Sequence, residues 1–247
     1  MRVAVLDWGI GGASCAQGLR ARCPDLDIVY LSDSGHTPYG LLPRVALAKR
    51  VSWLLAMGQA DLGVLACNAA SSVLEEVHAS HPVEGLVDYG LEVAMEVERG
   101  PIGVLAGQRV VTDGLYTRPL RAAGRTVLDS CGQPLSALVE RGELSGRHVM
   151  EAVAGCISPL RGASVVLLAC THYAALSEHL RRAMPDVTLL DPVPRMVDVL
   201  VDRYGLSEAP GAGSLTVFTS GSQPEMRRAA ASVYGWELPP VLHPLEP

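Results

Sequence analysis

The chain has 247 residues, about half of them apolar and a fifth charged, and its formal net charge is −6. This length suits one large α/β domain or two small ones, and the composition is that of an ordinary globular protein. A negative balance without a basic cluster argues against a nucleic acid or an anionic membrane as partner. No apolar run approaches the roughly 18 residues that a membrane span needs.

The cysteines and the N-terminus indicate the compartment. None of the six cysteines forms a C-x-x-C pair, which suits reduced thiols in a cytosol better than disulfides or a zinc site. The opening MRVAVLD turns acidic before a signal-peptide core could develop, so we expect a cytoplasmic protein. The single lysine, Lys49, stands in a helix-like stretch, which argues against a pyridoxal phosphate enzyme.

In chain order, Arg2–Leu6 predicts a strand that ends at Asp7. The glycine-rich turn 9–12, a helix over 14–22 and a strand over 27–31 follow, which is the opening of a βαβ unit. A dinucleotide site is one alternative, because Asp33 lies about 20 residues after the glycines, where a ribose-binding acid belongs. The G-x-G-x-x-G fingerprint is incomplete, however, since Ser14 stands where its last glycine belongs.

The next segment brings the first notable strand end. A turn over 36–40 and a helix over 42–57 precede an apolar run from Ala60 that ends at Cys67 and Asn68. A helix over 69–78, an apolar segment over 83–87 and a helix over 91–98 complete this part.

At Gly100 the pattern restarts, and it ends on the same cysteine motif. We expect strands over 102–106, 126–129 and 188–190, helices over 116–123, 148–160, 176–183 and 195–204, and an apolar stretch over 133–141 that carries Glu140. The buried strand within 163–169 ends at Cys170, and Thr171 and His172 follow. A last strand, 215–219, and a helix, 224–234, return to the first lobe.

The fold class is therefore α/β, with two similar lobes, each a mainly parallel sheet flanked by helices. Lobe one would comprise residues 1–99 and 208–247, and lobe two residues 100–207. Because ligands bind beyond the carboxyl ends of parallel strands, the active site is expected in the cleft between the lobes.

Two facing cysteines suit a proton transfer without a cofactor. One thiolate would remove a proton from a carbon while the opposite thiol supplies one from the other face, which inverts a stereocentre. The alternatives are a nucleophilic Cys170 with His172 as its base, and buried cysteines that only pack. A metal site would need three or four closely spaced soft ligands, which the sequence does not offer.

The chain resembles the aspartate/glutamate racemase superfamily along essentially its full length. The resemblance rests on LDWGIGG, SDSGHTPYG, ACNAAS, PLSALVERGE, ACTHY, LLDPV and FTSGS, in this order. It implies a cofactor-independent amino-acid racemase that interconverts L- and D-glutamate and supplies D-glutamate for peptidoglycan. The implied partner is a small-molecule amino-acid substrate, and a homodimer is expected because the family often forms dimers. The implied catalytic residues are Cys67, Cys170, Asp7, His172 and Glu140. The implied substrate-binding residues are Asp7, Trp8, Tyr39, Gly40, Asn68, Ala69, Thr171 and His172.

Three motifs depart from the family pattern. Trp8 replaces the serine of D-S-G, Ala69 the threonine of C-N-T, and the segment from Gly107 to Val110 lacks both threonines of G-T-x-x-T. Each lost hydrogen bond to a charged group could cost about 1.5–3 kcal/mol. Two alternatives therefore stay open: a relative that acts on a different amino or 2-substituted acid, and a binding protein that no longer catalyses.

Overall fold

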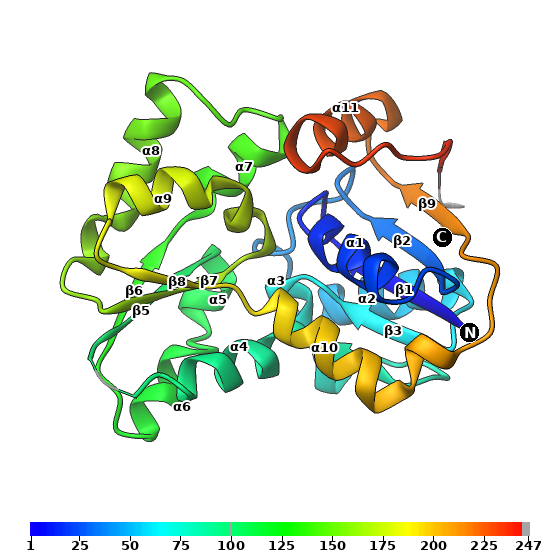
Figure 1. The fold of residues 1–247 in the computed structure, drawn as a ribbon, viewed down its shortest axis with the longest axis horizontal. Coiled ribbons are helices and arrows are strands. Elements are labelled where there is room, and N and C mark those ends of the chain that lie inside the picture. The colour runs from blue at the N-terminus through cyan, green and yellow to red at the C-terminus, as the bar shows by residue number, and fades with distance from the viewer. Residues whose placement is uncertain (99, 244–247) are drawn as a thin grey trace.

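Two parallel sheets, side by side in Figure 1, organise the chain in a computed structural model that describes residues 1–98 and 100–243. The six-stranded sheet consists of β1 (Arg2–Asp7), β2 (Asp27–Ser32), β3 (Leu62–Leu65), β4 (Val83–Gly85), β9 (Leu215–Thr219) and β10 (Val241–Leu242). The four-stranded sheet consists of β5 (Ile102–Ala106), β6 (Val127–Cys131), β7 (Val165–Ala169) and β8 (Thr188–Leu190). The two-lobe α/β fold class is thereby confirmed.

The strand order of the larger sheet places the strand ends that carry Asp7 and Cys67 side by side. The larger sheet has the order β10-β9-β2-β1-β3-β4, so β1 lies between β2 and β3. Strand β1, which ends with Asp7, is therefore adjacent to β3, which precedes Cys67. Strand β9 pairs in parallel with β2, which confirms that the chain returns to the first sheet after it has built the second. The smaller sheet has the order β6-β5-β7-β8.

Helices cover the faces of both sheets (Figure 1). They are α1 (Ala13–Arg22), α2 (Arg44–Gly58), α3 (Asn68–Ser71), α4 (Leu86–Met95), α5 (Gln108–Thr112), α6 (Thr117–Ala122), α7 (Gln133–Glu140), α8 (Arg147–Ile157), α9 (Ser177–Ala183), α10 (Val193–Tyr204) and α11 (Gln223–Tyr234). The 3-10 turns are η1 (Leu74–Glu76), η2 (Ser158–Leu160), η3 (Thr171–Leu176) and η4 (Leu206–Glu208).

Strand β1 explains why the sequence shows continuous apolar runs. Val3 and Val5 pack in one cluster with α1, whereas Ala4 and Leu6 pack in another with α2. A strand that is buried on both faces needs apolar residues at every position.

One core cluster extends through both sheets, since it includes Val5 of β1 as well as Val166 and Leu168 of β7. Helix α10, which the sequence analysis assigned to lobe two, packs against α1 and α4. The lobe boundaries stay a prediction. Residues 99 and 244–247, which the prediction placed in lobe one, lie outside the described residues.

The region after Cys67 differs from the expected helix over 69–78. It consists of the one-turn helix α3 followed by η1. The Ser71 hydroxyl donates to the carbonyls of Leu65 and Cys67, and that of Ser72 to the carbonyl of Ala69. Serine side chains that bond nearby carbonyls compete with a regular helix, which explains the early end.

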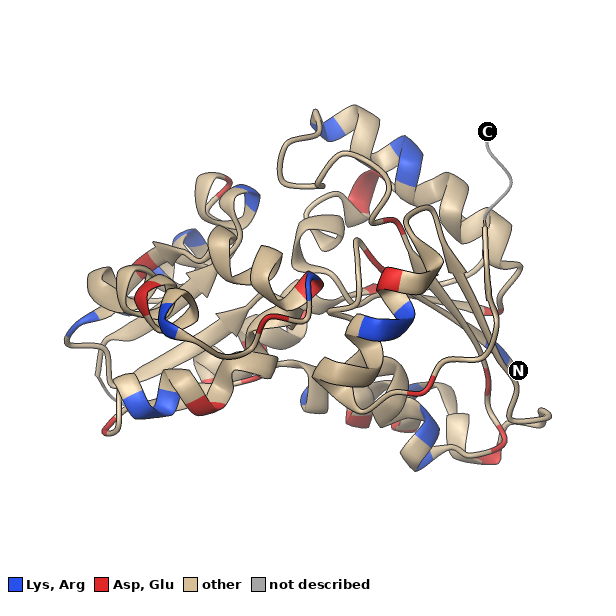
Figure 2. Cartoon of the chain, turned by 90° about the horizontal axis from the view of Figure 1, so that it is seen from above, with Lys and Arg blue, Asp and Glu red and all other residues tan. Residues whose placement is uncertain are grey.

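The other differences between the predicted and the observed elements involve short segments. Strand β4 ends at Gly85 and α4 begins directly after it, five residues before the predicted start. Helix α5 and strand β10 were not expected, because five and two residues are too few to show a periodic pattern. Within the described part of the chain, no helix is long and apolar enough to cross a membrane. Figure 2 shows acidic and basic residues interspersed over both lobes.

Candidate active site

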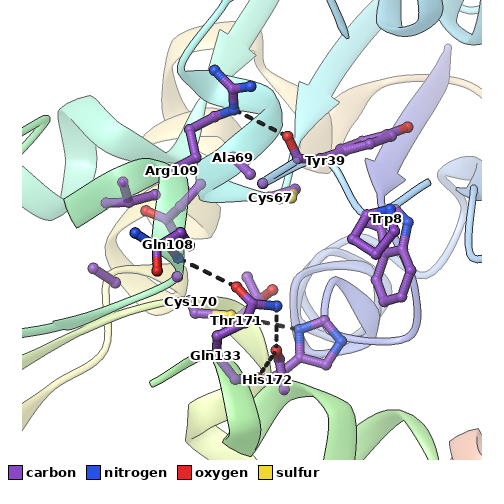
Figure 3. Close-up of a pocket in the computed structure, with 17 residues that line it drawn as sticks. Trp8, Tyr39, Cys67, Ala69, Gln108, Arg109, Gln133, Cys170, Thr171 and His172 are labelled. Carbon is purple, nitrogen blue, oxygen red and sulfur yellow. Dashed lines mark hydrogen bonds between the residues drawn. The ribbon is translucent and has the colours of Figure 1, made fainter. Parts of the chain in front are cut away.

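Cys67 and Cys170 occupy equivalent places in the two sheets. Each follows the carboxyl end of a strand, β3 or β7, with extended backbone, and each directly precedes a short helical turn. Both line the same pocket, so the strands deliver the two thiols from opposite lobes to one space (Figure 3). The sequence prediction that two matched strand ends meet is confirmed.

The pocket encloses about 510 Å³, part of it open to solvent. Its lining is formed by Trp8, Pro38, Tyr39, Gly40, Cys67, Asn68, Ala69, Gly107, Gln108, Arg109, Val110, Gln133, Ser136, Ala169, Cys170, Thr171 and His172. Nine of the residues expected from the sequence are among them.

A hydrogen-bonded chain leads away from Cys170. Its Sγ lies 3.6 Å from Nδ1 of His172, whose Nε2 lies 2.6 Å from Oε1 of Glu140. Burial by itself lowers the pKa of His172, but the hydrogen bonds and charges of Cys170 and Glu140 outweigh it and raise this pKa well above its ordinary value. These partners therefore favour the protonated imidazole, whose Nδ1 faces the Sγ of Cys170.

Cys67 has the opposite environment. Burial raises its pKa, and the negative charge of Asp7 raises it further, while the backbone amides of Ala70 and Trp8 offset only part of this effect. Cys67 therefore remains a neutral thiol. The two cysteines of the pocket thus have different surroundings, with the carboxyl group of Asp7 near Cys67 and the imidazole of His172 beside Cys170.

Asp7 and Glu140 do not line the pocket but lie behind it. Asp7 is fully buried and accepts hydrogen bonds from the Gly9 amide at 2.8 Å and from the Thr171 hydroxyl at 3.0 Å. Burial raises the pKa of Asp7, although the charge of His172 lowers it in part. Each acid therefore acts on the pocket indirectly: Asp7 holds Thr171 in place, and Glu140 holds His172.

The glycine-rich turn makes room for this support. A Cβ atom on Gly9 would lie 1.8 Å from Oε1 of Glu140, and one on Gly11 would lie 2.4 Å from Nδ1 of His172. The Ile10 amide also donates to Glu140 at 2.5 Å. The side chains of Glu140 and His172, from the second lobe, thus occupy the space beside this turn.

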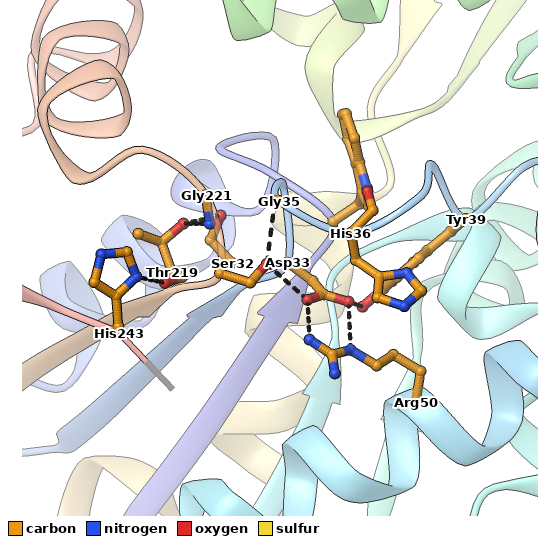
Figure 4. A network of polar contacts seen from close by, with 11 residues as sticks. Ser32, Asp33, Gly35, His36, Tyr39, Arg50, Thr219, Gly221 and His243 are labelled. Carbon is orange, nitrogen blue, oxygen red and sulfur yellow. Dashed lines mark hydrogen bonds and ion pairs between the residues drawn. The ribbon is translucent and has the colours of Figure 1, made fainter. Parts of the chain in front are cut away.

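Besides the incomplete glycine fingerprint, the surroundings of Asp33 argue against a dinucleotide site (Figure 4). The carboxylate of Asp33, proposed there as a ribose ligand, is buried and fully engaged. It accepts hydrogen bonds from Arg50 at 2.7 and 3.0 Å, from the Tyr39 hydroxyl at 2.9 Å and from Ser220 at 2.8 Å. Tyr39 therefore presents its backbone to the pocket, while its hydroxyl is bonded elsewhere.

Several pocket residues were missed by sequence reasoning, above all Arg109 and Gln133. Arg109 donates from Nε to the carbonyl of Tyr39 at 3.0 Å and from another nitrogen to that of Leu42. Gln133 accepts from the Gln108 amide at 3.3 Å. The one available signal was the altered G-T-x-x-T segment, which lacks both threonines but contains the polar residues Gln108 and Arg109. Among residues 1–98 and 100–243, no group of three or more acidic, histidine or cysteine side chains could hold a metal ion.

The fold and this pocket define the class of protein. Residues 14–200 match the model of the Asp/Glu/Hydantoin racemase family, and the chain belongs to that family. It is accordingly an amino-acid racemase, an isomerase.

Individual relatives agree along nearly the whole chain. A glutamate racemase of Desulforudis audaxviator is 32% identical over 97% of this chain and 96% of its own. One of Aquifex aeolicus is 28% identical over 98% of this chain and 97% of its own. A structure of glutamate racemase from Francisella tularensis in complex with D-glutamate covers 99% of this chain and 97% of its own, with a TM-score of 0.85 at 21% identity. At 21% identity, the similarity to the Francisella tularensis structure shows the fold alone.

Proposed function

We propose that the protein interconverts L- and D-glutamate by two-base proton transfer between Cys67 and Cys170. The observation that carries this proposal is the position of the two thiols, one from each sheet, in a single pocket with different electrostatic surroundings. The glutamate racemase names of the similar proteins support glutamate as the substrate.

In the proposed reaction, the Cys170 thiolate removes the α-proton and the carbanion electron pair is left on the α-carbon. The Cys67 thiol then delivers its proton to the opposite face of that carbon. The product leaves Cys170 as a thiol and Cys67 as a thiolate, so the other enantiomer reacts by the reverse transfer. The α-proton is a weak acid, so the pocket must stabilise the carbanion with oriented donors.

Supporting residues take complementary roles in this proposal. The imidazolium of His172, paired with Glu140, stabilises the Cys170 thiolate. When Asp7 is ionised, the Thr171 hydroxyl donates a hydrogen bond to its carboxylate and presents acceptor lone pairs to the pocket. Thr171 would therefore bind the ammonium group of the substrate, and Asn68 its carboxylate.

A second candidate is a racemase for a different amino or 2-substituted acid. It is favoured by the indole of Trp8, which lines the pocket where the family pattern has a serine, and by Ala69 and Gly107. Arg109 also lines the pocket, but it replaces the lost hydroxyl groups only in part. Its guanidinium is already bonded to the backbone carbonyls of Tyr39 and Leu42.

The test is exchange of the α-proton in D₂O, followed by proton NMR with D- and L-glutamate. We expect the wild type to exchange both enantiomers, whereas Cys67→Ser and Cys170→Ser each lose racemisation. Cys23→Ser, a buried cysteine outside the pocket, is the matched control and retains activity. Exchange of another acid but not glutamate would favour the second candidate, and silence across a panel of acids from folded, reduced protein would overturn both.

We also propose that the reaction supplies D-glutamate for peptidoglycan, in the cytoplasm, where free thiols such as these six cysteines persist. The homodimer expected from the family resemblance stays a prediction. Sedimentation velocity tests it, and a single species of 26.1 kDa at micromolar concentration would contradict it.

A further inference from the structure

Asn68 carries an unused hydrogen-bond donor. Its side chain is only 3% exposed, it lines the pocket beside Cys67, and its Nδ2 has no hydrogen-bond partner among the described residues. A buried N–H group without a partner is costly, so such a group in a pocket indicates a ligand oxygen.

The other end of the same amide is held by the opposite lobe. The hydroxyl of Tyr116, which directly precedes α6, donates to Oδ1 of Asn68. Tyr116 is itself 1% exposed. A phenol has one proton to donate, and this is the hydrogen bond that the structure gives it. If the amide were turned over, Nδ2 would face the phenol and the phenol proton would lose its acceptor.

Helix α4 is shaped to admit the phenol ring. A Cβ atom on Gly90 would lie 2.6 Å from both Cε1 and the hydroxyl oxygen of Tyr116. Glycine lowers the stability of a helix interior relative to alanine, so its presence at this point has a steric reason. The ring of Tyr116 is thereby confined between α4 and Asn68.

We propose that Tyr116 is a positioning residue that fixes the amide of Asn68 across the lobe interface, so that Nδ2 donates to the substrate carboxylate. The inference rests on the proposed function, because it assigns the donor to the carboxylate of an amino-acid substrate. Tyr116 does not touch the substrate. It acts by excluding the amide orientation that would turn a carbonyl oxygen toward an anion.

The test compares Tyr116→Phe with Tyr89→Phe, a buried tyrosine of α4 whose hydroxyl bonds Glu84 instead. We expect Tyr116→Phe to raise KM for glutamate, and Kd measured by calorimetry, about tenfold, with kcat within about threefold of the wild type. Tyr89→Phe keeps the wild-type KM. A residue that merely stabilised the fold would lower the unfolding midpoint without this split between KM and kcat.

Two further variants separate positioning from packing. Asn68→Ala should raise KM, and adding Tyr116→Phe to it should cause no further increase, because the amide that Tyr116 orients is gone. Gly90→Ala keeps the phenol but displaces it, so it should reproduce the rise in KM. Additive effects in the double variant, or an unchanged KM in Tyr116→Phe, would overturn the inference.

Binding is measured apart from turnover so that the two proposals can fail separately. A wild type that binds glutamate but does not exchange its α-proton overturns the proposed function, and the Kd of Tyr116→Phe then still decides the role of Tyr116. A wild type that binds neither glutamate nor any other acid of the panel overturns both.

Discussion

His172 lies between a thiol and a carboxylate, and its charge depends on both. Glu140 accepts from Nε2 and thereby stabilises the imidazolium that faces Cys170. A carboxylate in this position also orients the imidazole ring, because it accepts a hydrogen bond from Nε2 and thereby turns Nδ1 toward Cys170. The activity of the proposed site should therefore depend on Glu140 even though this residue does not line the pocket.

We predict that Glu140→Gln lowers kcat/KM by about ten- to hundredfold, since it removes a hydrogen bond between charged groups. The basic limb of the pH–rate profile should move to lower pH, because His172 loses the partner that keeps it protonated. Glu143→Gln, an exposed acid that pairs with Arg141, is the matched control. An unmoved basic limb in Glu140→Gln would contradict the role of this pair.

The same pair predicts how stability depends on pH. The pKa of His172 is raised in the folded state, so its stabilising contribution is complete below about 6.5, the unfolded value, and is lost as pH rises through the folded value. The free energy of unfolding of the wild type should fall over that range, and less so in Glu140→Gln. Urea unfolding at a series of pH values above 6.5 measures this difference.

Trp8 is fixed as one wall of the pocket, because its indole nitrogen donates to the carbonyl of His36 at 3.1 Å. We predict that Trp8→Ala enlarges the pocket and raises the ratio of kcat/KM for glutamate over aspartate about tenfold, since a longer side chain gains more from the space. Trp53→Ala, which removes an indole beneath Arg50 and outside the pocket, should leave the ratio unchanged. If Trp8→Ala also leaves it unchanged, the indole does not select the substrate side chain.

At the scale of elements, the loop between β2 and α2 is attached to the sheet by the Asp33 network of Figure 4. The side chain of Asp33 is fully buried, and Arg50 of α2 supplies its counter-charge. The Tyr39 hydroxyl bonds the same carboxylate, so this network also sets the position of the Tyr39 backbone in the pocket.

We predict that Arg50→Met destabilises the protein by about 3–5 kcal/mol, because it leaves a buried carboxylate without its partner. Urea denaturation measures the loss. Arg22→Ala, which breaks an ion pair between half-exposed side chains, should cost at most about 1 kcal/mol. Equal effects of the two variants would show that the Asp33–Arg50 pair contributes no more than a surface ion pair.

At the scale of the whole molecule, residues of one lobe complete the pocket of the other. Thr171 bonds Asp7, Tyr116 bonds Asn68, and Arg109 of α5 bonds the loop at Tyr39 and Leu42. The relative position of the two sheets therefore sets the geometry of the pocket, and contacts that cross between them should affect binding.

We predict that Arg109→Ala raises KM about tenfold, because charge-assisted bonds to two carbonyls are lost and the segment 38–42 is released. Hydrogen–deuterium exchange should show faster exchange in that segment. Arg121→Ala, an exposed arginine of α6, is the control. Wild-type exchange over 38–42 in Arg109→Ala would show that another contact holds the segment.

The sequence alone determined the two-lobe α/β fold, because buried parallel strands appear as continuous apolar runs. It also placed Cys67 and Cys170 at one site, because sites form at the carboxyl ends of such strands. The family resemblance of its motifs also named nine residues of the pocket lining. These features are local patterns or repeated motifs, so they can be recognised without knowledge of the contacts between distant parts of the chain.

Only the tertiary structure decided which polar groups face one another. It placed Asp7 and Glu140 behind the pocket, engaged Asp33 with Arg50, and joined Tyr116 to Asn68 across 48 positions of sequence. It also ended the helix after Cys67 early, through serine hydroxyls that bond nearby carbonyls. Hydrogen bonds and steric fits between the lobes depend on three-dimensional proximity, and the spacing of residues along the chain does not encode that proximity.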